Sequence, residues 1–523
     1  MRGKVVLIGA GPGDPQLLTL RGKHCLEQAD CIVYDRLASK ELLGYAKQDC
    51  ECVYVGKENH HHTMRQEEIN ALLYEKTGHC ALVVRLKGGD PYVFGRGAEE
   101  ALFLKEKGVA VEVVSGISSV IAALADAGIP ITHRGLSKGF QVVTAHSRKD
   151  VPADIDYAKM QDDTITYLFL MGLSHVKEIA TGLMAAGKSA DTPVAVISNG
   201  TTAGQKKVVG SLQNIDQMVS QANLVSPAII VVGAVVSLSD QLDFFEKRPL
   251  FGKKYVVPYI TSCKFRFGLG QEAFSDEEGC NSELVRKLEE QGAQVCAVKV
   301  GRIVPVKIPK EDLLESLRSD WLLFTSQNGV YSFLWNLKEY GLDIRSVSGC
   351  RIAVVGQKTA QALEQVAIKA DLMPDQHTAR SLCACMTERN LFQGRKDLHI
   401  TLFGAKQTNE DMITFLKAQC QFRKMVCYQN AIVENVQNGY DNIDFKRFDG
   451  ILFTSGSSVT RFLKLSKGML PECIYAIGPT CSAVVKKETG CSCMEAKNAG
   501  YQELCELVVE DAVNKTNEMK GQL

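Results

Sequence analysis

Short apolar runs alternate with amphipathic stretches along the first half of the chain. Each run ends in a loop rich in Gly, Asp or Lys, and the stretches between the runs have the length and spacing of helices. This alternation is typical of α/β domains, which collect ligands at the carboxyl ends of their strands. The predicted strands are 5–8, 31–34, 53–55, 81–86, 111–114, 141–144, 166–171, 194–198 and 228–232.

The alternation is interrupted at 246–254, a charged stretch that contains Pro249 and Gly252. A polar stretch with both helix breakers is typical of a linker. We therefore expect one domain at 1–245 and a second at 255–523, each folding separately.

The second half repeats a strand-to-helix pattern. The apolar run 321–324 is followed by Thr325-Ser326, and the run 450–453 is followed by Thr454-Ser455. The repeat predicts two α/β lobes, one made of 255–300 with 429–523 and the other of 301–428. In each copy the Thr-Ser pair is expected to cap a helix and to direct N–H groups and hydroxyls toward a ligand between the lobes.

Composition narrows the choice of partners. The 523 residues include 60 Lys plus Arg and 60 Asp plus Glu, so the formal net charge is zero. A neutral chain is unsuited to wrapping nucleic acid, and we expect small-molecule partners and no nucleic acid. The longest apolar stretch, 228–238, is far shorter than the roughly 20 residues that span a bilayer, so no membrane association is expected.

The 18 cysteines include no C-x-x-C pair. The patterns of zinc ribbons, thioredoxins and ferredoxins are therefore missing, and buried free thiols in a reducing cytoplasm are the simpler interpretation. The run His60-His61-His62 invites a metal interpretation, but three consecutive side chains cannot all face one ion. We predict a cytoplasmic protein without a metal site.

A glycine-rich loop follows the first predicted strand. Gly9, Gly11 and Gly13 have the spacing of a nicotinamide dinucleotide loop, and an acidic residue ends the second strand. Asp14, however, stands where that loop needs Gly or Ala, and its carboxylate would repel a pyrophosphate. Pro12 also removes one N–H donor. A ligand without phosphates, or a sulfonium, fits this loop better.

A second loop, 85–97, combines paired glycines with three cations. The glycines allow a ligand to approach the main chain closely, and cations suit a substrate with several carboxylates. Each cation taken alone is equally compatible with a solvated turn.

Taken together, these segments resemble a known family. The matching segments lie at 5–15, 34–37, 55–57, 85–97, 128–134 and 199–201, in the same order and at the same spacing. They resemble uroporphyrinogen-III C-methyltransferase over about 1–245. The part from about 251 to 523 resembles uroporphyrinogen-III synthase through its paired Phe-Thr-Ser segments. The implied fold is a two-lobed α/β domain of the tetrapyrrole-methylase type followed by a two-lobed synthase-like α/β domain.

The first resemblance implies two S-adenosylmethionine-dependent methylations that convert uroporphyrinogen III to precorrin-2, and a homodimer formed through this domain. It implies that Asp35 is the proton acceptor and Lys57 the proton donor. Capping of the turn after the strand remains an alternative role for Asp35, and a solvated loop position remains one for Lys57. The implied cofactor contacts, mostly through main chain, are Pro12, Gly88, Gly89, Asp90, Val93, Ser118, Ser119, Met171 and Gly200.

Three arginines, Arg85, Arg96 and Arg134, are candidates for clamping substrate carboxylates bidentately, with surface salt bridges as the alternative. One departure from the family pattern is Ser115-Gly116-Ile117-Ser118, where Pro-Gly-Ile-Thr is usual. The hydroxyl at the fourth position is kept, so the cofactor contact is expected to survive.

The second resemblance implies closure of linear hydroxymethylbilane with inversion of its last pyrrole. Tyr428 is then the best candidate for helping the hydroxyl leave, and Thr359 and Thr480 would contact substrate. Helix capping and core hydroxyl pairing are the alternative roles for these threonines. The family's early Arg-rich segment is not recognisable here, which leaves the substrate grip of that lobe open.

A fusion of the two activities is economical, because the product of the second half is the substrate of the first. One alternative is a second half that only senses tetrapyrroles. A less favoured one is a methyltransferase acting on RNA ribose, against which the lack of a basic run argues. The pattern does not distinguish a role in sirohaem synthesis from one in cobalamin synthesis.

Overall fold

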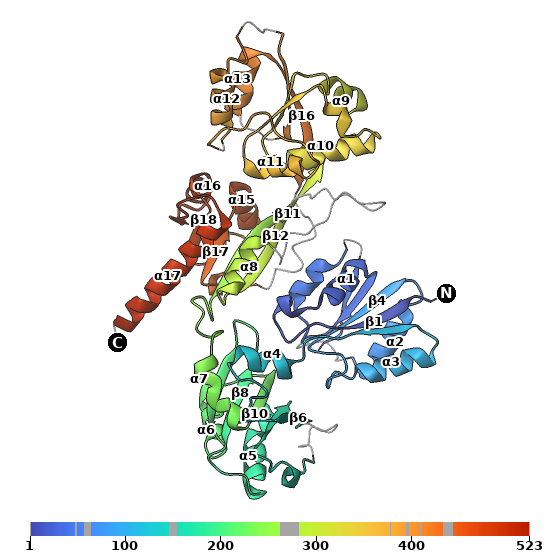
Figure 1. Ribbon diagram of the computed structural model, residues 1–523, viewed down its shortest axis with the longest axis vertical. Helices are drawn as coiled ribbons and strands as arrows, with labels where there is room; N and C mark the ends of the chain where they lie inside the picture. Colours follow the sequence, from blue (N-terminus) through green and yellow to red (C-terminus); the bar gives the residue numbers. More distant parts are fainter. Residues whose placement is uncertain are drawn as a thin grey trace. The chain divides into compact units, whose positions relative to one another are not determined.

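The computed structural model describes residues 2–47, 50–56, 64–145, 154–261, 282–376, 378–393, 397–406, 410–431 and 443–521 (Figure 1). Lys57 and the run His60-His61-His62 lie outside these ranges. The chain divides into two compact units, one made of 1–255 with 283–296 and 505–523, the other of 256–282 with 297–504.

The first sheet of the amino-terminal unit has the strand order β3-β2-β4-β1-β5, and each strand runs parallel to its neighbours. The predicted strands are confirmed, with ends that differ by at most two residues. The strands are β1 (Lys4–Gly9), β2 (Cys31–Tyr34), β3 (Glu51–Tyr54), β4 (Leu82–Lys87) and β5 (Val111–Val114). The helices are α1 (Leu20–Gln28), α2 (Gln66–Lys76) and α3 (Gly97–Glu106).

Alternate residues of each strand face opposite layers of helix. Val5 and Leu7 of β1 pack with the apolar side of α2 and α3, whereas Val6 and Ile8 pack with Leu26 of α1. Because both faces of the central strands are covered, apolar residues stand at consecutive positions of β1 and β2 rather than at alternate ones, and the polar residues of β4 are Arg85 and Lys87 near its end. This burial fixes the sheet and leaves the loops at its carboxyl edge to carry polar chemistry.

The second sheet of this unit has the order β6-β7-β10-β8-β9 and is mixed. β10 (Ala228–Val232) runs antiparallel to β7 (Ile165–Leu170) and β8 (Pro193–Ser198), while β6 (Gly139–Thr144) runs parallel to β7. The sequence analysis missed β9 (Lys206–Ser211), an edge strand that starts with two lysines and has few apolar positions. The helices are α4 (Ser119–Asp126), α5 (Val176–Ala185), α6 (Ile215–Ala222) and α7 (Ser239–Leu242).

The stretch predicted as a linker, 246–254, packs against the residue that precedes it. Leu250 of this stretch and the preceding Phe245 are buried, and the Phe245 and Phe251 ring centroids lie 5.6 Å apart. The Arg248 guanidinium lies 4.7 Å from the Phe245 ring centroid. The stretch is thus less exposed than its charge suggests, and the proposed domain boundaries stay a prediction.

A nine-stranded sheet in the order β14-β13-β15-β16-β12-β11-β17-β18-β19 organises the second half. β13 (Trp321–Phe324), β14 (Arg351–Val354) and β15 (His399–Ala405) form one parallel group, and β17 (Gly450–Phe453), β18 (Cys473–Ala476) and β19 (Met494–Glu495) form another. The long strands β11 (Lys254–Thr261), β12 (Gln294–Pro305) and β16 (Gln421–Ala431) lie between the groups. The helices are α8 (Glu283–Glu290), α9 (Lys310–Ser316), α10 (Gln327–Glu339), α11 (Gln357–Glu364), α12 (Ala379–Glu388), α13 (Glu410–Gln419), α15 (Gly456–Leu465), α16 (Pro479–Thr489) and α17 (Tyr501–Gly521).

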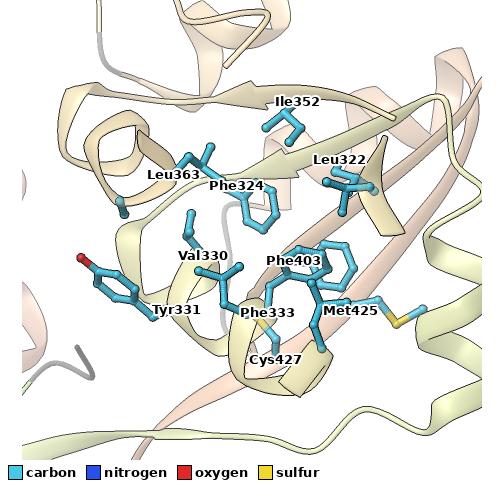
Figure 2. Close-up of a cluster of buried hydrophobic side chains, with 14 of the residues drawn as sticks. Leu322, Phe324, Val330, Tyr331, Phe333, Ile352, Leu363, Phe403, Met425 and Cys427 are labelled. Atoms are coloured by element: carbon cyan, nitrogen blue, oxygen red, sulfur yellow. The ribbon is translucent and has the colours of Figure 1, made fainter. Parts of the chain in front are cut away.

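An aromatic cluster forms the core beneath α10 (Figure 2). The Phe333 and Phe403 ring centroids are 4.6 Å apart, and the Phe324 and Phe403 rings stack with an interplanar angle of 16°. Such ring pairs add to the free energy gained by burying apolar area. The cluster ties α10 to the four neighbouring strands β14, β13, β15 and β16.

The predicted repeat is confirmed in the backbone. β13 leads into α10 and β17 into α15, and in each case the serine of the Thr-Ser pair is the N-cap. Ser326 Oγ accepts the N–H of Gly329 at 3.2 Å, and Ser455 Oγ accepts the N–H of Ser458 at 3.2 Å. The hydroxyls thus satisfy helix N–H groups that have no intrahelical partner.

Candidate active sites

Three loops meet at the carboxyl edge of the first sheet. The backbone N–H of Gly89 donates to the carbonyl oxygen of Gly11 at 2.7 Å, and the N–H of Gly11 donates to the carbonyl oxygen of Gly89 at 3.2 Å. The two Asp90 carboxylate oxygens accept the N–H of Tyr92 at 2.8 Å and that of Gly116 at 3.0 Å. A Cβ on Gly116 would overlap the backbone of Gly9 and Gly89, so the loops after β1, β4 and β5 touch through glycine.

The loop after β8, in the second sheet, joins this group. The N–H of Asp14 donates to Thr201 Oγ1 at 3.2 Å, and a Cβ on Gly200 would overlap Ala123 in α4. The predicted cofactor residues Ser118 and Ser119 form the N-cap and first residue of that same helix. The predicted contacts at Pro12, Gly88, Gly89, Asp90, Ser118, Ser119 and Gly200 are therefore carried by loops that pack together.

Backbone strain is concentrated in these loops. Four non-glycine residues of the loops after β4 and β8 have positive φ: Phe94 (54°), Arg96 (58°), Asn199 (49°) and Thr201 (68°), and Met171 (56°), directly after β7, is a fifth. Each such residue costs about 1–3 kcal/mol and persists only where the surroundings impose it. Residues of this kind cluster at binding sites. The side chains of Val93, Phe94 and Met171 are also exposed, as apolar contacts for a ligand need to be.

Asp35 lies directly after β2 and has two partners. One carboxylate oxygen accepts the N–H of Leu37 at 3.1 Å, and the other accepts Nη2 of Arg85 at 3.1 Å. The turn-capping role is thus present in the structure. The side chain still keeps 27% of its surface exposed, so capping does not close it off from a substrate.

Arg85 is buried, contrary to the role predicted for it. Its side chain is 3% exposed, and its guanidinium also donates to Glu100 at 3.3 Å and to the carbonyls of Val33 and Leu86. A guanidinium with no exposed surface and four acceptors already bound is not placed to clamp substrate carboxylates. The geometry assigns it to holding Asp35.

Glu100, which the sequence analysis missed, is the centre of this buried charge cluster. It is fully buried, and its Oε1 also accepts Lys87 Nζ at 2.8 Å and Gln66 Nε2 at 3.0 Å. Burial lowers the pKa of Lys87, and the charge of Arg85 lowers it further, while Glu100 opposes both. The available signal was a carboxylate on the apolar face of α3, one residue before the buried Ala101.

The other two predicted clamps are exposed. Arg96 forms a bidentate pair with Glu99, at 3.0 and 2.8 Å, and 53% of its side chain is exposed. Arg134 is exposed on the turn before β6. Both have the access to solvent that Arg85 lacks.

Tyr428 lies on β16 with its hydroxyl at the start of α10. Its Oη is 2.9 Å from Ser326 Oγ, and the residue is 9% exposed. Desolvation raises the pKa of the phenol, and the hydrogen bond with Ser326 acts in the opposite direction. A phenol positioned in this way can hold a proton and donate it.

The two predicted threonines do not occupy equivalent positions. Thr359 is the third residue of α11 and is buried, whereas Thr480 is the second residue of α16 and is exposed. A shift of one residue rotates a helical side chain by about 100°. Contact with substrate is therefore more accessible to Thr480.

No group of three or more His, Cys, Asp or Glu side chains in the described ranges is arranged to hold a metal ion. No helix among the described residues is long and apolar enough to cross a membrane. The cysteines of the described ranges are free thiols, but burial holds for only six of them: eight others are half-buried, and Cys52 and Cys491 are exposed.

Comparison with known proteins shows that the two halves of the chain match two different protein families. The family profile of tetrapyrrole (corrin/porphyrin) methylases matches residues 4–216, and that of uroporphyrinogen-III synthase HemD matches 282–506. A porphyrin biosynthesis protein HemD from Ruminiclostridium josui is 36% identical over 91% of this chain and 91% of its own length. The chain belongs to this family of fused tetrapyrrole methylases and synthases.

Two further relatives cover the methylase half alone. A uroporphyrinogen-III C-methyltransferase from Methanocaldococcus jannaschii is 48% identical over 46% of this chain and 99% of its own length. The crystal structure of uroporphyrin-III C-methyl transferase from Thermus thermophilus complexed with S-adenyl homocysteine is 38% identical, covers 45% of this chain and 99% of its own, and has a TM-score of 0.39.

The stabilising role of buried Glu100 in the methylase half can be tested by comparing its replacement with that of the exposed Glu99. Glu100→Gln leaves Lys87 buried without the carboxylate it pairs with and leaves Arg85 with Asp35 as its counter-ion, which we expect to destabilise the first sheet by about 3–5 kcal/mol. Glu99→Gln, one residue earlier and 49% exposed, is expected to change stability by less than about 1 kcal/mol. Hydrogen exchange of the β1 and β4 amides measures the opening of this sheet alone. Equal effects from the two variants would contradict the assignment.

Proposed function

We propose that this chain converts hydroxymethylbilane to uroporphyrinogen III with its second half and methylates that product twice with its first half, giving precorrin-2. The observation that carries the proposal is the presence on one chain of two families whose reactions follow one another. The product suits sirohaem and cobalamin synthesis alike. The RNA-modifying alternative is not favoured.

The loops of the methylase half fit S-adenosylmethionine as the cofactor. Their glycine contacts leave backbone groups accessible, Asp14 disfavours phosphate, and exposed Val93 and Met171 offer apolar surface. When bound, S-adenosylmethionine supplies the methyl group. The proposed contacts remain those carried by Pro12, Gly88, Gly89, Asp90, Val93, Ser118, Ser119, Met171 and Gly200.

Asp35 supplies the proton chemistry in this proposal. Methylation of a pyrrole carbon leaves a cationic macrocycle that must lose a proton. A carboxylate fixed by Arg85 and still partly exposed can stabilise that cation and then accept the proton. Gly88 keeps the turn that carries Asp35 close to the loop after β4, since a Cβ there would lie 2.5 Å from Leu37 Cβ. Lys57 remains the proposed donor, and Arg96 and Arg134 remain the proposed substrate clamps.

Asp35→Asn is expected to slow dimethylation by roughly 100-fold or more while leaving S-adenosylmethionine binding intact. Asp30→Asn is the matched control, because Asp30 precedes the same strand, accepts the Leu82 N–H at 2.8 Å and pairs with Lys47. Mass spectrometry after incubation with uroporphyrinogen III follows the gain of two methyl groups, and calorimetry follows cofactor binding. Full activity of Asp35→Asn would show that Asp35 caps the turn and takes no part in proton transfer.

In the second half, shape is expected to matter more than strong acids or bases. Loss of the terminal hydroxyl of hydroxymethylbilane gives a reactive azafulvene, and spontaneous closure then yields the wrong isomer. A site that holds the bound chain with its last ring inverted changes the outcome by orientation alone. Tyr428 is proposed to assist departure of the hydroxyl, and Thr359 and Thr480 to contact the substrate.

Hydroxymethylbilane supplied to the full chain is expected to give uroporphyrinogen III in clear excess over isomer I. Chromatographic separation of the oxidised products measures the ratio, with a reaction lacking protein as the control. Isomer I formed at the background rate would refute the synthase activity and favour a half that only senses tetrapyrroles.

We also propose that the methylase domain, 1–245, folds alone and forms a homodimer. Exposed apolar side chains on this domain, Leu102 and Phe140 among them, are available for burial against a second copy. Expression of 1–246 and of 250–523 as separate proteins is expected to give two folded products, with light scattering reporting a dimer for the first. An unfolded fragment would contradict the boundary, and a folded monomer would contradict the dimer.

A further inference from the structure

Ser326 and Ser455 are two copies of one helix cap. Both have extended backbone, with φ of −155° and −162°, and both accept the N–H of the residue three positions later at the same distance. Because the two caps have the same local geometry, any functional difference between Ser326 and Ser455 must come from the residues around their hydroxyls. Ser455 can therefore serve as the control for Ser326.

The surroundings differ at the hydroxyl. Ser326 Oγ lies 2.9 Å from Tyr428 Oη, whereas Ser455 Oγ lies 3.2 Å from Ser457 Oγ. A serine hydroxyl has one proton to donate and two lone pairs. Since Ser326 Oγ already accepts the Gly329 N–H, it can donate its own proton to the phenol oxygen, which leaves the phenol proton free for another acceptor.

A β-bulge brings Tyr428 to this serine. β15 and β16 pair in parallel register up to Gly404 with Val426, but Ala405 then pairs with Tyr428, so Cys427 is an extra residue. Regular alternation would place Tyr428 on the face opposite Met425 and Cys427. After the bulge all three belong to the core cluster that includes α10.

The core around the ring restricts its movement. Tyr428 packs in the same cluster as Val330 and Phe403, and Cys427 Sγ lies 3.7 Å from the Gly329 carbonyl. The phenol oxygen is thus held beside the first turn of α10 by packing and lies within hydrogen-bond distance of Ser326 Oγ.

We propose that Ser326 is a positioning residue for Tyr428 in ring closure, an inference that rests on the proposed synthase activity. The Tyr428 O–H gives its proton to the hydroxyl of hydroxymethylbilane as the C–O bond breaks, and water leaves. Ser326 donates its hydrogen bond to the phenolate that results. The resulting azafulvene carbon bonds the substituted α-carbon of the last pyrrole, the bond from that α-carbon to its neighbouring bridge carbon breaks, and the freed bridge carbon bonds the unsubstituted α-carbon, which inverts the ring. That α-carbon then loses its proton, which returns to Tyr428. One water is released and the enzyme is regenerated.

The test is a pair of double-mutant cycles in the full chain under single-turnover conditions, with protein in excess over hydroxymethylbilane. Tyr428→Phe is expected to slow formation of isomer III by about 10-fold, a modest effect because the hydroxyl leaves easily. In a Ser326→Ala background the same change is expected to slow it by less than about 2-fold, because the two residues act as one unit. In a Ser455→Ala background the full effect of about 10-fold is expected to remain, since that serine does not contact the phenol.

The isomer ratio separates positioning from damage to the fold. With all substrate bound, Ser326→Ala is expected to slow the reaction while isomer III stays the main product, since the shape of the site is kept. Ser326→Gly retains good capping and is expected to give the same kinetic defect, and Ser326→Thr is expected to restore the rate.

Independent effects of Ser326→Ala and Tyr428→Phe would overturn the positioning role, as would a rise in isomer I with Ser326→Gly. A wild-type chain that yields only isomer I would instead refute the synthase proposal itself. The two failures are therefore distinguishable.

Discussion

Parallel strands place their carboxyl ends along one edge of a sheet, and this constraint positions the chemistry of both halves. Asp35 follows β2, the paired glycines follow β4, and Ser326 follows β13. Each group follows a strand that is almost wholly buried, so the strand fixes where the loop begins. The strained residues in the methylase loops persist because that rigid edge imposes them.

The buried charged side chains of the methylase half orient a single carboxylate, Asp35. Arg85 and Lys87 are nearly inaccessible to solvent, and Glu100 lies between them as a fully buried counter-ion. A buried ion pair contributes little net stability compared with apolar packing. Its effect here is orientation, because the guanidinium that Glu100 holds in place is the group that binds Asp35. Of the three arginines predicted to clamp substrate, Arg85 is therefore a buried support for a single carboxylate, and Arg96 and Arg134 are exposed.

The fold was largely predictable from sequence because strands buried on both faces leave a strong apolar signal. The strands of the first sheet and the repeated strand-to-helix units fall where the pattern placed them. β9 was missed because its lysine-rich start carries little of that signal. The site was harder to predict. Whether an arginine faces solvent or a buried carboxylate depends on Glu100, fifteen residues away from Arg85 and on another element. The different burial of Thr359 and Thr480 likewise arises from an offset of one residue in the repeat.

The bulge in β16 changes which alterations of the gene this half can tolerate. If Cys427 were lost together with the bulge, the tyrosine would follow Met425 by two positions, still opposite Ala405, and the phenol would keep its face of the sheet. A strand of the present length that paired regularly would instead turn the phenol to the other face. The direction of this side chain therefore couples chain length to the bulge, and related proteins that keep the tyrosine are expected to have either the extra residue with a bulge or neither.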